Sequence, residues 1–340
     1  KMHIAGMGIV FNRGRGLAAL DSALMAGWAK PQDSFYRVPK EALTDKEVLK
    51  EARRADNFTK MATLAAYDAL ADSQIPPAAK KKVGIILATA FGPHVTTFNF
   101  LDDILTYGDA GVSPTLFSHS VHNAAASYIA LNLETRGPTL TMTQFADSFQ
   151  QAIILAQTWL EEKRCEYVLA GSADQIGKVI EYIFSQKLKL APDAKIRPFS
   201  CSAAPVAVPG EGSAFFLLTN NPQYKKYCSI SGLPDENQKT DLFILDSDGL
   251  CGSEECYRSV AKNPAAVAAY TPIFGSLPTV SSFSAMAGAL TLKRQKSFPN
   301  PVADNPFNLN ILAADTTFPV HKIACLRYNC NQEESIIRLF

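Results

Sequence analysis

The sequence predicts an α/β fold in which layers of helices cover sheets. Short apolar stretches of strand length alternate with longer stretches whose apolar residues repeat at helical spacing. This alternation continues along the whole chain and starts again after a polar stretch at Asn220–Lys226. Alternation of this kind is typical of layered α/β proteins. The restart indicates two halves, residues 1–219 and 227–340, although no literal repeat relates them.

In the first half, strands are expected where apolar runs are short, and helices where apolar residues recur three or four positions apart. The expected strands are Ile4–Val10, Val83–Thr89, Thr139–Thr143, Tyr167–Gly171 and Gly212–Leu218. The expected helices are Ala55–Ser73, Asn99–Tyr107, Ser118–Leu133 and Ala146–Glu162. Asp56 or Asn57 supplies an N-cap for the first of these helices.

The second half follows the same pattern with fewer elements. Strands are expected at Cys228–Ser231, Leu242–Leu245 and Asn310–Ala313, with further strand pieces near the end of the chain. A helix is expected from about Ser281 to Lys293.

The composition excludes several classes of function. The 340 residues carry a net charge of +1, so the chain has no basic field that would attract nucleic acid or an anionic membrane. Its longest apolar runs, such as 83–91, have strand length and are too short to span a bilayer. The opening residues lack the apolar segment and cleavage pattern of a signal peptide. A cytoplasmic location is therefore expected.

Seven cysteines in a chain of this length do not suggest a disulfide scaffold. Two pairs, Cys251/Cys256 and Cys325/Cys330, have four residues between them, which is wider than most zinc-binding pairs, and the segments around them have the pattern of strands rather than of zinc knuckles. Reduced thiols are expected, with no metal site and no cofactor.

A longer segment, residues 113–153, resembles the part of β-ketoacyl synthases that leads from a dimer-interface helix into the nucleophile turn. It contains S-V-x-N-A-A-A at 120–126 and R-G-P at 136–138. Further motifs of that family follow in the same order: Gly6-Met7-Gly8, Ala170–Asp174, Arg197-Pro198-Phe199, Gly210–Ala214 and Ala285–Ala289. The resemblance covers nearly the whole chain and implies a thiolase-like, five-layered αβαβα fold made of two duplicated halves.

The sequence departs from the family at each catalytic position. Ala146 stands where an active ketosynthase has its cysteine, at a helix N-terminus that would stabilise a thiolate and an oxyanion. The two catalytic histidines align with Asp248 and Ser282, and the supporting lysine aligns with Leu277. The glycine-rich gate near the C-terminus is replaced by 326–330, which contains no glycine. The resemblance therefore implies a homologue without the Cys-His-His residues.

Such a homologue is similar to the chain-length factor of a type II polyketide ketosynthase, and to the small factors of aryl-polyene pathways. The resemblance implies a heterodimer with a catalytic ketosynthase subunit, and an acyl carrier protein that docks mainly on that partner. This subunit would supply the far wall of the acyl tunnel, where close packing limits chain length. The candidates for the wall or the interface are Phe117, His119, His122, Tyr128, Thr139, Thr141, Thr143 and Gln144.

Other interpretations of these residues remain open. Asp147 and Ser148 are explained as helix caps, and Asp248 as a turn residue before Gly249. An enzyme of altered chemistry, such as a malonyl-carrier decarboxylase or an acyl hydrolase, would need Asp147, Ser148 or Ser282 as its active group. A homodimeric protein that sequesters acyl carriers is a third possibility.

Overall fold

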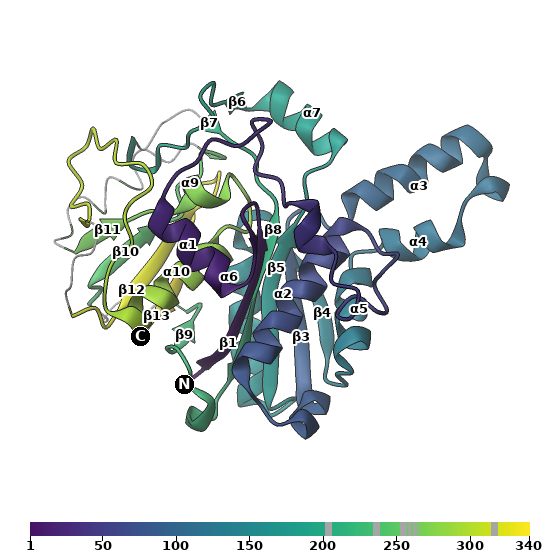
Figure 1. The fold of residues 1–340 in the computed structure, drawn as a ribbon, viewed down its shortest axis with the longest axis horizontal. Coiled ribbons are helices and arrows are strands. Elements are labelled where there is room, and N and C mark those ends of the chain that lie inside the picture. Colours follow the sequence, from purple (N-terminus) through teal and green to yellow (C-terminus); the bar gives the residue numbers. More distant parts are fainter. Residues whose placement is uncertain are drawn as a thin grey trace.

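The computed structural model describes residues 1–200, 206–233, 239–251, 257, 260, 263, 265–313 and 319–340. Within these ranges two sheets lie side by side, with helices between them and outside them (Figure 1). All strands of the six-stranded sheet come from residues before 220, and all strands of the five-stranded sheet come from residues after 229.

The first sheet has the order β2-β1-β8-β5-β3-β4. Its strands are β1 (His3–Phe11), β2 (Gly14–Arg15), β3 (Val83–Thr89), β4 (Thr139–Thr143), β5 (Tyr167–Asp174) and β8 (Gly212–Thr219). Strands β4, β3 and β5 run parallel to one another, so their carboxyl ends meet at one edge of the sheet. This edge holds the candidate site.

The second sheet has the order β11-β10-β12-β13-β9. Its strands are β9 (Ile230–Ser231), β10 (Leu242–Leu245), β11 (Ala266–Ala268), β12 (Ile323–Tyr328) and β13 (Glu334–Leu339). A separate pair, β6 (Lys189–Leu190) and β7 (Val206–Ala207), lies near α7 (Lys178–Lys187).

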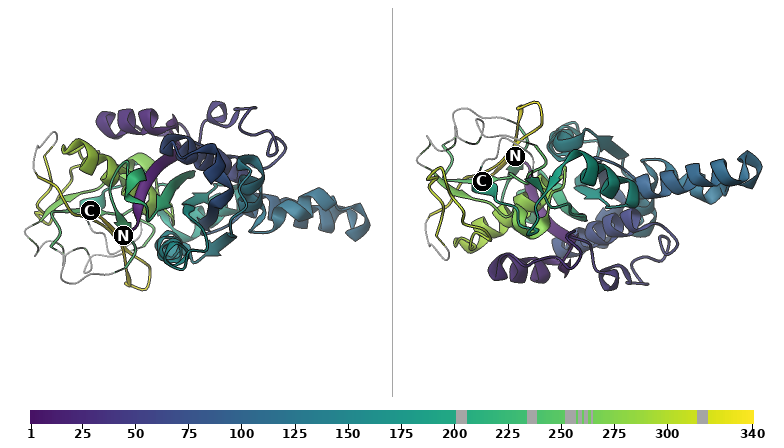
Figure 2. Two further views of the ribbon diagram at one scale, coloured as in Figure 1. Left: turned by 90° about the horizontal axis from the view of Figure 1, so that it is seen from below. Right: turned by 90° about the horizontal axis from the view of Figure 1, so that it is seen from above.

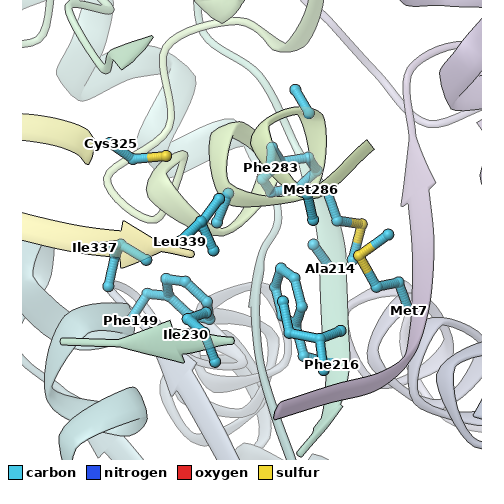
Figure 3. Close-up of a cluster of buried hydrophobic side chains, with 14 of the residues drawn as sticks. Met7, Phe149, Ala214, Phe216, Ile230, Phe283, Met286, Cys325, Ile337 and Leu339 are labelled. Carbon is cyan, nitrogen blue, oxygen red and sulfur yellow. The ribbon is translucent and has the colours of Figure 1, made fainter. Parts of the chain in front are cut away.

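Two helices, α6 (Ser148–Glu161) and α10 (Ser281–Arg294), fill the space between the sheets and contact both. Figure 3 shows the core that this arrangement buries: Phe149 of α6 and Met286 of α10 meet Phe216 of the first sheet and Leu339 of the second. Burying large apolar side chains contributes about 1.5–3 kcal/mol each, which explains why these helices hold the two halves together.

The remaining helices cover the outer faces or leave the body of the molecule. Helices α2 (Asn57–Ser73) and α5 (Ala124–Leu133) cover the face of the first sheet that points away from the second. Helix α1 (Leu17–Ala26) packs beside β1, and α9 (Thr271–Phe274) precedes α10. Helices α3 (His94–Tyr107) and α4 (Pro114–Ser120) form an arm that projects beyond the sheets in all views (Figures 1 and 2).

Most predicted elements are present, some with the predicted bounds. Strands β3, β4 and β10 begin and end at the predicted residues. Helix α2 begins after Asp56, whose carboxylate accepts a hydrogen bond from the Thr59 N–H, as an N-cap should. Helices α1 and α7 and strand β11 were not predicted.

Four predicted elements are wrong in detail. Helix α3 begins at His94, five residues before the predicted start at Asn99. The helix predicted over Ser118–Leu133 is interrupted at Val121, which has extended dihedral angles, and it divides into α4 and α5. The segment Asn310–Ala313 is not a strand, because only Ile311 forms an isolated bridge, to Val267. The helix expected from Ala146 starts at Ser148, after a single 3₁₀ turn. Within the described residues, no helix is both long enough and apolar enough to cross a membrane.

Candidate active site

The turn between β4 and α6 has an unusual backbone. Phe145 has a φ of +46°, a value that residues other than glycine adopt rarely and at some energetic cost. The next residue, Ala146, is buried and lies just before α6. Its side chain is a single methyl group. The chain thus keeps a strained turn at a helix N-terminus and places there a side chain with no reactive atom.

Ser148 holds this turn in place. Its Oγ accepts a hydrogen bond from the Gln144 N–H at 2.7 Å and lies 2.9 Å from the Phe145 carbonyl and 3.0 Å from the Thr89 carbonyl. The side chain is fully buried. All three hydrogen-bond contacts of this hydroxyl are therefore with backbone atoms of the turn and of β3.

Asp147 does not cap the helix, contrary to the expectation. Its carboxylate makes no capping bond to α6 and accepts a hydrogen bond from Asn329 Nδ2 at 3.1 Å. Asn329 lies in the turn after β12, within the segment 326–330, which we call the gate segment. The capping prediction was wrong because the gate segment, distant in sequence, supplies a better partner than the helix.

Asp248 follows β10 and lies in a turn, as predicted. Gly249 has a φ of +82°, and a side chain there would collide with the backbone of Val206. One Asp248 carboxylate oxygen accepts a hydrogen bond from the Leu250 N–H at 3.1 Å. The sequence did not reveal the other contact: Arg327 of the gate segment lies 3.2 Å from Asp248 Oδ2, and both side chains are almost completely buried.

A third connection is covalent. Cys251 forms a disulfide with Cys330, so the turn after β10 is bonded to the gate segment. The expectation of reduced thiols is wrong for this pair, whereas Cys165, Cys228 and Cys325 are free and buried. Burial raises the pKa of the Cys228 thiol to about 12. Cys256 and Gly252 lie outside the described residues.

Ser282 and Leu277 lie on the other side of the site. Both are fully buried. The hydroxyl of Ser282 is 2.6 Å from the hydroxyl of Ser172 on β5 and donates to the Thr279 carbonyl at 3.0 Å. In the part of the chain that the structure describes, no group of three histidine, cysteine or acidic side chains is arranged to hold a metal ion.

A buried carboxylate links the same strands. Asp174, at the end of β5, accepts hydrogen bonds from Thr89, Thr279 and the N–H groups of Ala90 and Phe91. Desolvation raises its pKa, and the four donors oppose that rise. Asp174 therefore fixes the carboxyl ends of β3 and β5 to the start of α10.

A family model described as the β-ketoacyl synthase N-terminal domain matches residues 41–223, more than half of the chain. The chain belongs to the β-ketoacyl synthase family. Its match includes the turn at Ala146 but not Asp248, Ser282 or the gate segment.

Solved structures of ketosynthases resemble the entire chain. The ishigamide ketosynthase/chain length factor has a TM-score of 0.82 at 15% identity, over 99% of this chain and 98% of the other. A β-ketoacyl synthase from Burkholderia phymatum STM815 has a TM-score of 0.77 at 16% identity, over 100% and 99%. At such low identity the likeness establishes the fold, so the predicted thiolase-like α/β architecture is confirmed.

Two curated polyketide synthase proteins show higher identity over shorter regions. The spectinabilin polyketide synthase system protein NorB of Streptomyces orinoci is 29% identical over 147 residues, or 41% of this chain. The pikromycin polyketide synthase component PikAIII of Streptomyces venezuelae is 30% identical over 176 residues, or 50% of this chain. The ketosynthase-like chain spans only 6% and 11% of these two proteins.

The predicted wall residues of this ketosynthase homologue lie on two helices and in the linker between them. Phe117, on α4, is exposed and contacts the Phe100 ring of α3. His119 Nε2 lies 2.6 Å from the hydroxyl of Tyr128, on α5. His122 is exposed in the linker between the helices, and its ring is so close to Gly92 that a side chain there would collide with it.

The predicted interface residues lie along the outer strand of the first sheet. Among the described residues β4 pairs only with β3, so its other edge is open. Thr139, Thr143 and Gln144 are exposed, and the hydroxyl of Thr141 has no hydrogen-bond partner in the described chain.

Sequence reasoning missed the gate contacts. A lone arginine within the apolar strand β12 was the available signal, because a buried arginine needs a buried acid. Asp248 was identified, but no sequence pattern related it to Arg327.

Proposed function

We propose that this chain is the non-catalytic, chain-length-factor type of subunit, which pairs with an active β-ketoacyl synthase in polyketide or fatty-acid-like chain elongation. Ala146 carries the proposal. An acyl chain must be transferred to a nucleophile at this turn, and a methyl group cannot accept it. The positions aligned with the two histidines hold Asp248 and Ser282, and the Asp248 carboxyl group already contacts Arg327 and the Leu250 N–H rather than an open site.

The gate segment supports the same proposal. In a working synthase, substrate must pass between the gate and the catalytic turns. Here three contacts join them: the Cys251–Cys330 disulfide, the Asp248–Arg327 ion pair, and the Asp147–Asn329 hydrogen bond. Each contact uses a residue at, or within three residues of, a position aligned with a catalytic residue. The substitutions thus convert a catalytic cleft into a cross-linked structural region.

The hydroxyl groups near the site do not favour an enzyme of altered chemistry. Ser148 and Ser282 are fully buried, and both are hydrogen-bonded to neighbouring backbone or side-chain atoms. A nucleophilic serine needs a general base within hydrogen-bond reach, and neither has a histidine or carboxylate among its hydrogen-bond partners in the described chain.

A partner subunit is supported by two neighbouring surfaces. The open edge of β4 presents unpaired backbone groups, which are a ready template for a strand of another chain. The arm formed by α3 and α4 has little contact with the body: only His94 and Thr96 of α3 are buried, and no residue of α4 is. The arm exposes the large apolar side chains Phe98, Leu101, Leu105, Tyr107 and Phe117.

The partner that we propose is the catalytic ketosynthase subunit, with the carrier protein docked mainly on that partner. The arm and its base would then reach the partner's acyl tunnel, and Phe117, His119, His122 and Tyr128 would form part of the wall. Apolar and aromatic lining suits an acyl or polyene chain. We propose an aryl polyene as the product class, and residues 1–219 and 227–340 as the two halves of the fold. We also propose a cytoplasmic location. The Cys251–Cys330 disulfide does not support it, because disulfides are more common in oxidising compartments.

Co-expression with a candidate ketosynthase, followed by mass measurement of the purified complex, tests the pairing. We expect a one-to-one heterodimer in which a malonyl or acyl thioester labels only the partner. A covalently acylated form of this chain, isolated without the partner, would contradict the proposal.

Substitution of the wall tests the measuring role. We expect Phe117→Ala or Tyr128→Ala to lengthen the products by one or more extension units, because a smaller side chain leaves room for a longer chain. Tyr182→Ala, which removes an exposed aromatic ring from α7, is the matched control. An unchanged product length from an intact complex would exclude the two residues from the wall.

A further inference from the structure

A polar cavity lies away from Ala146, between the β1–β2 turn and the segment that leads from α1 toward α2. Its volume is about 730 Å³, within the range of about 300–1,000 Å³ that is usual for small-molecule sites. The lining residues used below are Asn12, Arg13, Lys30, Phe35, Arg37 and Lys40. All belong to the first 41 residues of the chain, outside the family match that begins at residue 41.

Arg13 lies in this cavity without a counter-ion among the described residues. Its Nη2 is buried and has no hydrogen-bond partner among the described residues, and its Nη1 makes only a 3.5 Å contact with the Ala23 carbonyl. Desolvation by the surrounding protein lowers the pKa of the guanidinium. A partly buried charge without a partner is costly, so the arrangement favours an anion that can enter the cavity.

The surrounding charges leave the cavity positive. Arg37 is neutralised by Asp33 at 2.7 Å and by Glu181 at 2.8 Å. Lys30 and Lys40 are exposed at the rim, opposed there by Glu41. Counting Glu181 as well, the four cations Arg13, Lys30, Arg37 and Lys40 stand against the three acids Asp33, Glu41 and Glu181, so the lining keeps a net charge of +1.

Two further groups suit an organic anion. Asn12 lines the cavity, and the N–H₂ group of a carboxamide can donate hydrogen bonds to an anion. Phe35 supplies an aromatic wall. The cavity is larger than an inorganic ion requires.

We propose that this cavity binds a small phosphorylated organic molecule, with Arg13 contacting the phosphate and Lys30 and Lys40 attracting it at the rim. The planar guanidinium presents paired N–H donors that match phosphate oxygens. The site is separate from the substituted catalytic positions and does not depend on the function proposed above.

Isothermal titration with AMP as the probe, at low ionic strength, tests the site. We expect saturable binding of AMP and no binding of adenosine, because adenosine lacks the phosphate. Arg13→Gln should weaken the binding of AMP at least tenfold. Lys80→Gln, which removes an exposed charge from a remote 3₁₀ turn, should leave it unchanged.

A second variant keeps the test decisive if Arg13→Gln fails to fold. Asn12→Asp places a carboxylate beside Arg13, which satisfies the guanidinium internally and should reduce the affinity for AMP by a similar factor. Equal binding of adenosine and AMP, or affinity for AMP that neither substitution changes, would overturn the proposal.

Discussion

The most unusual residues of this chain are the charged side chains buried beneath the gate segment. Asp246, Asp248 and Arg327 are all nearly inaccessible to solvent, so two buried acidic side chains lie near a single buried basic one. Transferring charges out of water costs several kcal/mol for each ion, which a single ion pair seldom recovers in full. Asp248 has the arginine as its partner. Asp246 is the acid that remains uncompensated.

The Asp246 carboxylate makes no hydrogen bond of good geometry within the described chain. Desolvation raises its pKa from 3.8 to about 6, although nearby Ser284, Ser281 and Arg327 oppose the rise. Because the folded-state pKa exceeds the unfolded one, the folded protein binds more protons between these two values. Stability should therefore fall as the pH rises from about 4 to about 6, and remain lower above that.

Asp246→Asn should therefore stabilise the protein at pH 7.5. The difference between 3.8 and about 6 corresponds to about 3 kcal/mol, an upper value because the amide needs partners of its own. Urea unfolding at pH 4.5 and pH 7.5 measures the effect, which should be much smaller at the lower pH. Asp102→Asn, on the exposed face of α3, is the control. A destabilised variant at pH 7.5 would contradict this account.

At this scale, the sequence motifs predict which catalytic positions are substituted but not which contacts the residues at those positions make. Ala146, Asp248 and Ser282 were found because motifs flank them. Their partners, Arg327 and Asn329, lie in a segment whose motif has been lost, and pairing across 79 or more residues leaves no local pattern.

At the scale of elements, the disulfide joins the turn after β10 to the turn after β12. These two strands already pair in parallel, so the bond extends an existing connection beyond the edge of the sheet. The bond closes a loop of 79 residues, which restricts the unfolded chain strongly. Together with the Asp248–Arg327 pair, it fixes the gate segment relative to β10.

Reduction of this bond should destabilise the protein by about 2–4 kcal/mol. Thermal unfolding with and without dithiothreitol measures the loss. The double variant Cys251→Ser/Cys330→Ser should unfold at the temperature of the reduced protein, and dithiothreitol should not lower it further. If reductant lowered both melting temperatures equally, the effect would not come from this disulfide.

Elements were predictable where the sequence carries a local signal. Strands β3 and β10 are short apolar runs, and α2 combines helical spacing with a capping aspartate. The break between α4 and α5 contains no glycine or proline that would predict it. It occurs at Val121, which adopts an extended conformation within an otherwise helical pattern. Asn310–Ala313 has the composition of a strand, yet its hydrogen bonds to β11 all go to Val267 and form a single isolated bridge.

For the whole molecule, the main question is what covers the arm. An isolated helical pair with exposed apolar side chains is marginal in water, because most helix stability in proteins comes from packing. Phe100 and Phe117 contact each other across the arm, at 5.6 Å between ring centres, but Leu101, Leu105 and Tyr107 face solvent. The open edge of β4 at the base of the arm extends this surface. A second subunit would cover both.

Leu105 offers the clearest test of this surface, because its side chain is 84% exposed and therefore contributes little to the fold of the isolated chain. Leu105→Glu should leave the melting temperature of the isolated chain unchanged. It should weaken association with the proposed ketosynthase partner at least tenfold, because binding would bury a charge against apolar surface. Tyr182→Glu, an equally drastic change to an exposed side chain on α7, should have no effect on association. Sedimentation of mixed subunits distinguishes these outcomes, and loss of association in both variants, or in neither, would show that the arm is not the interface.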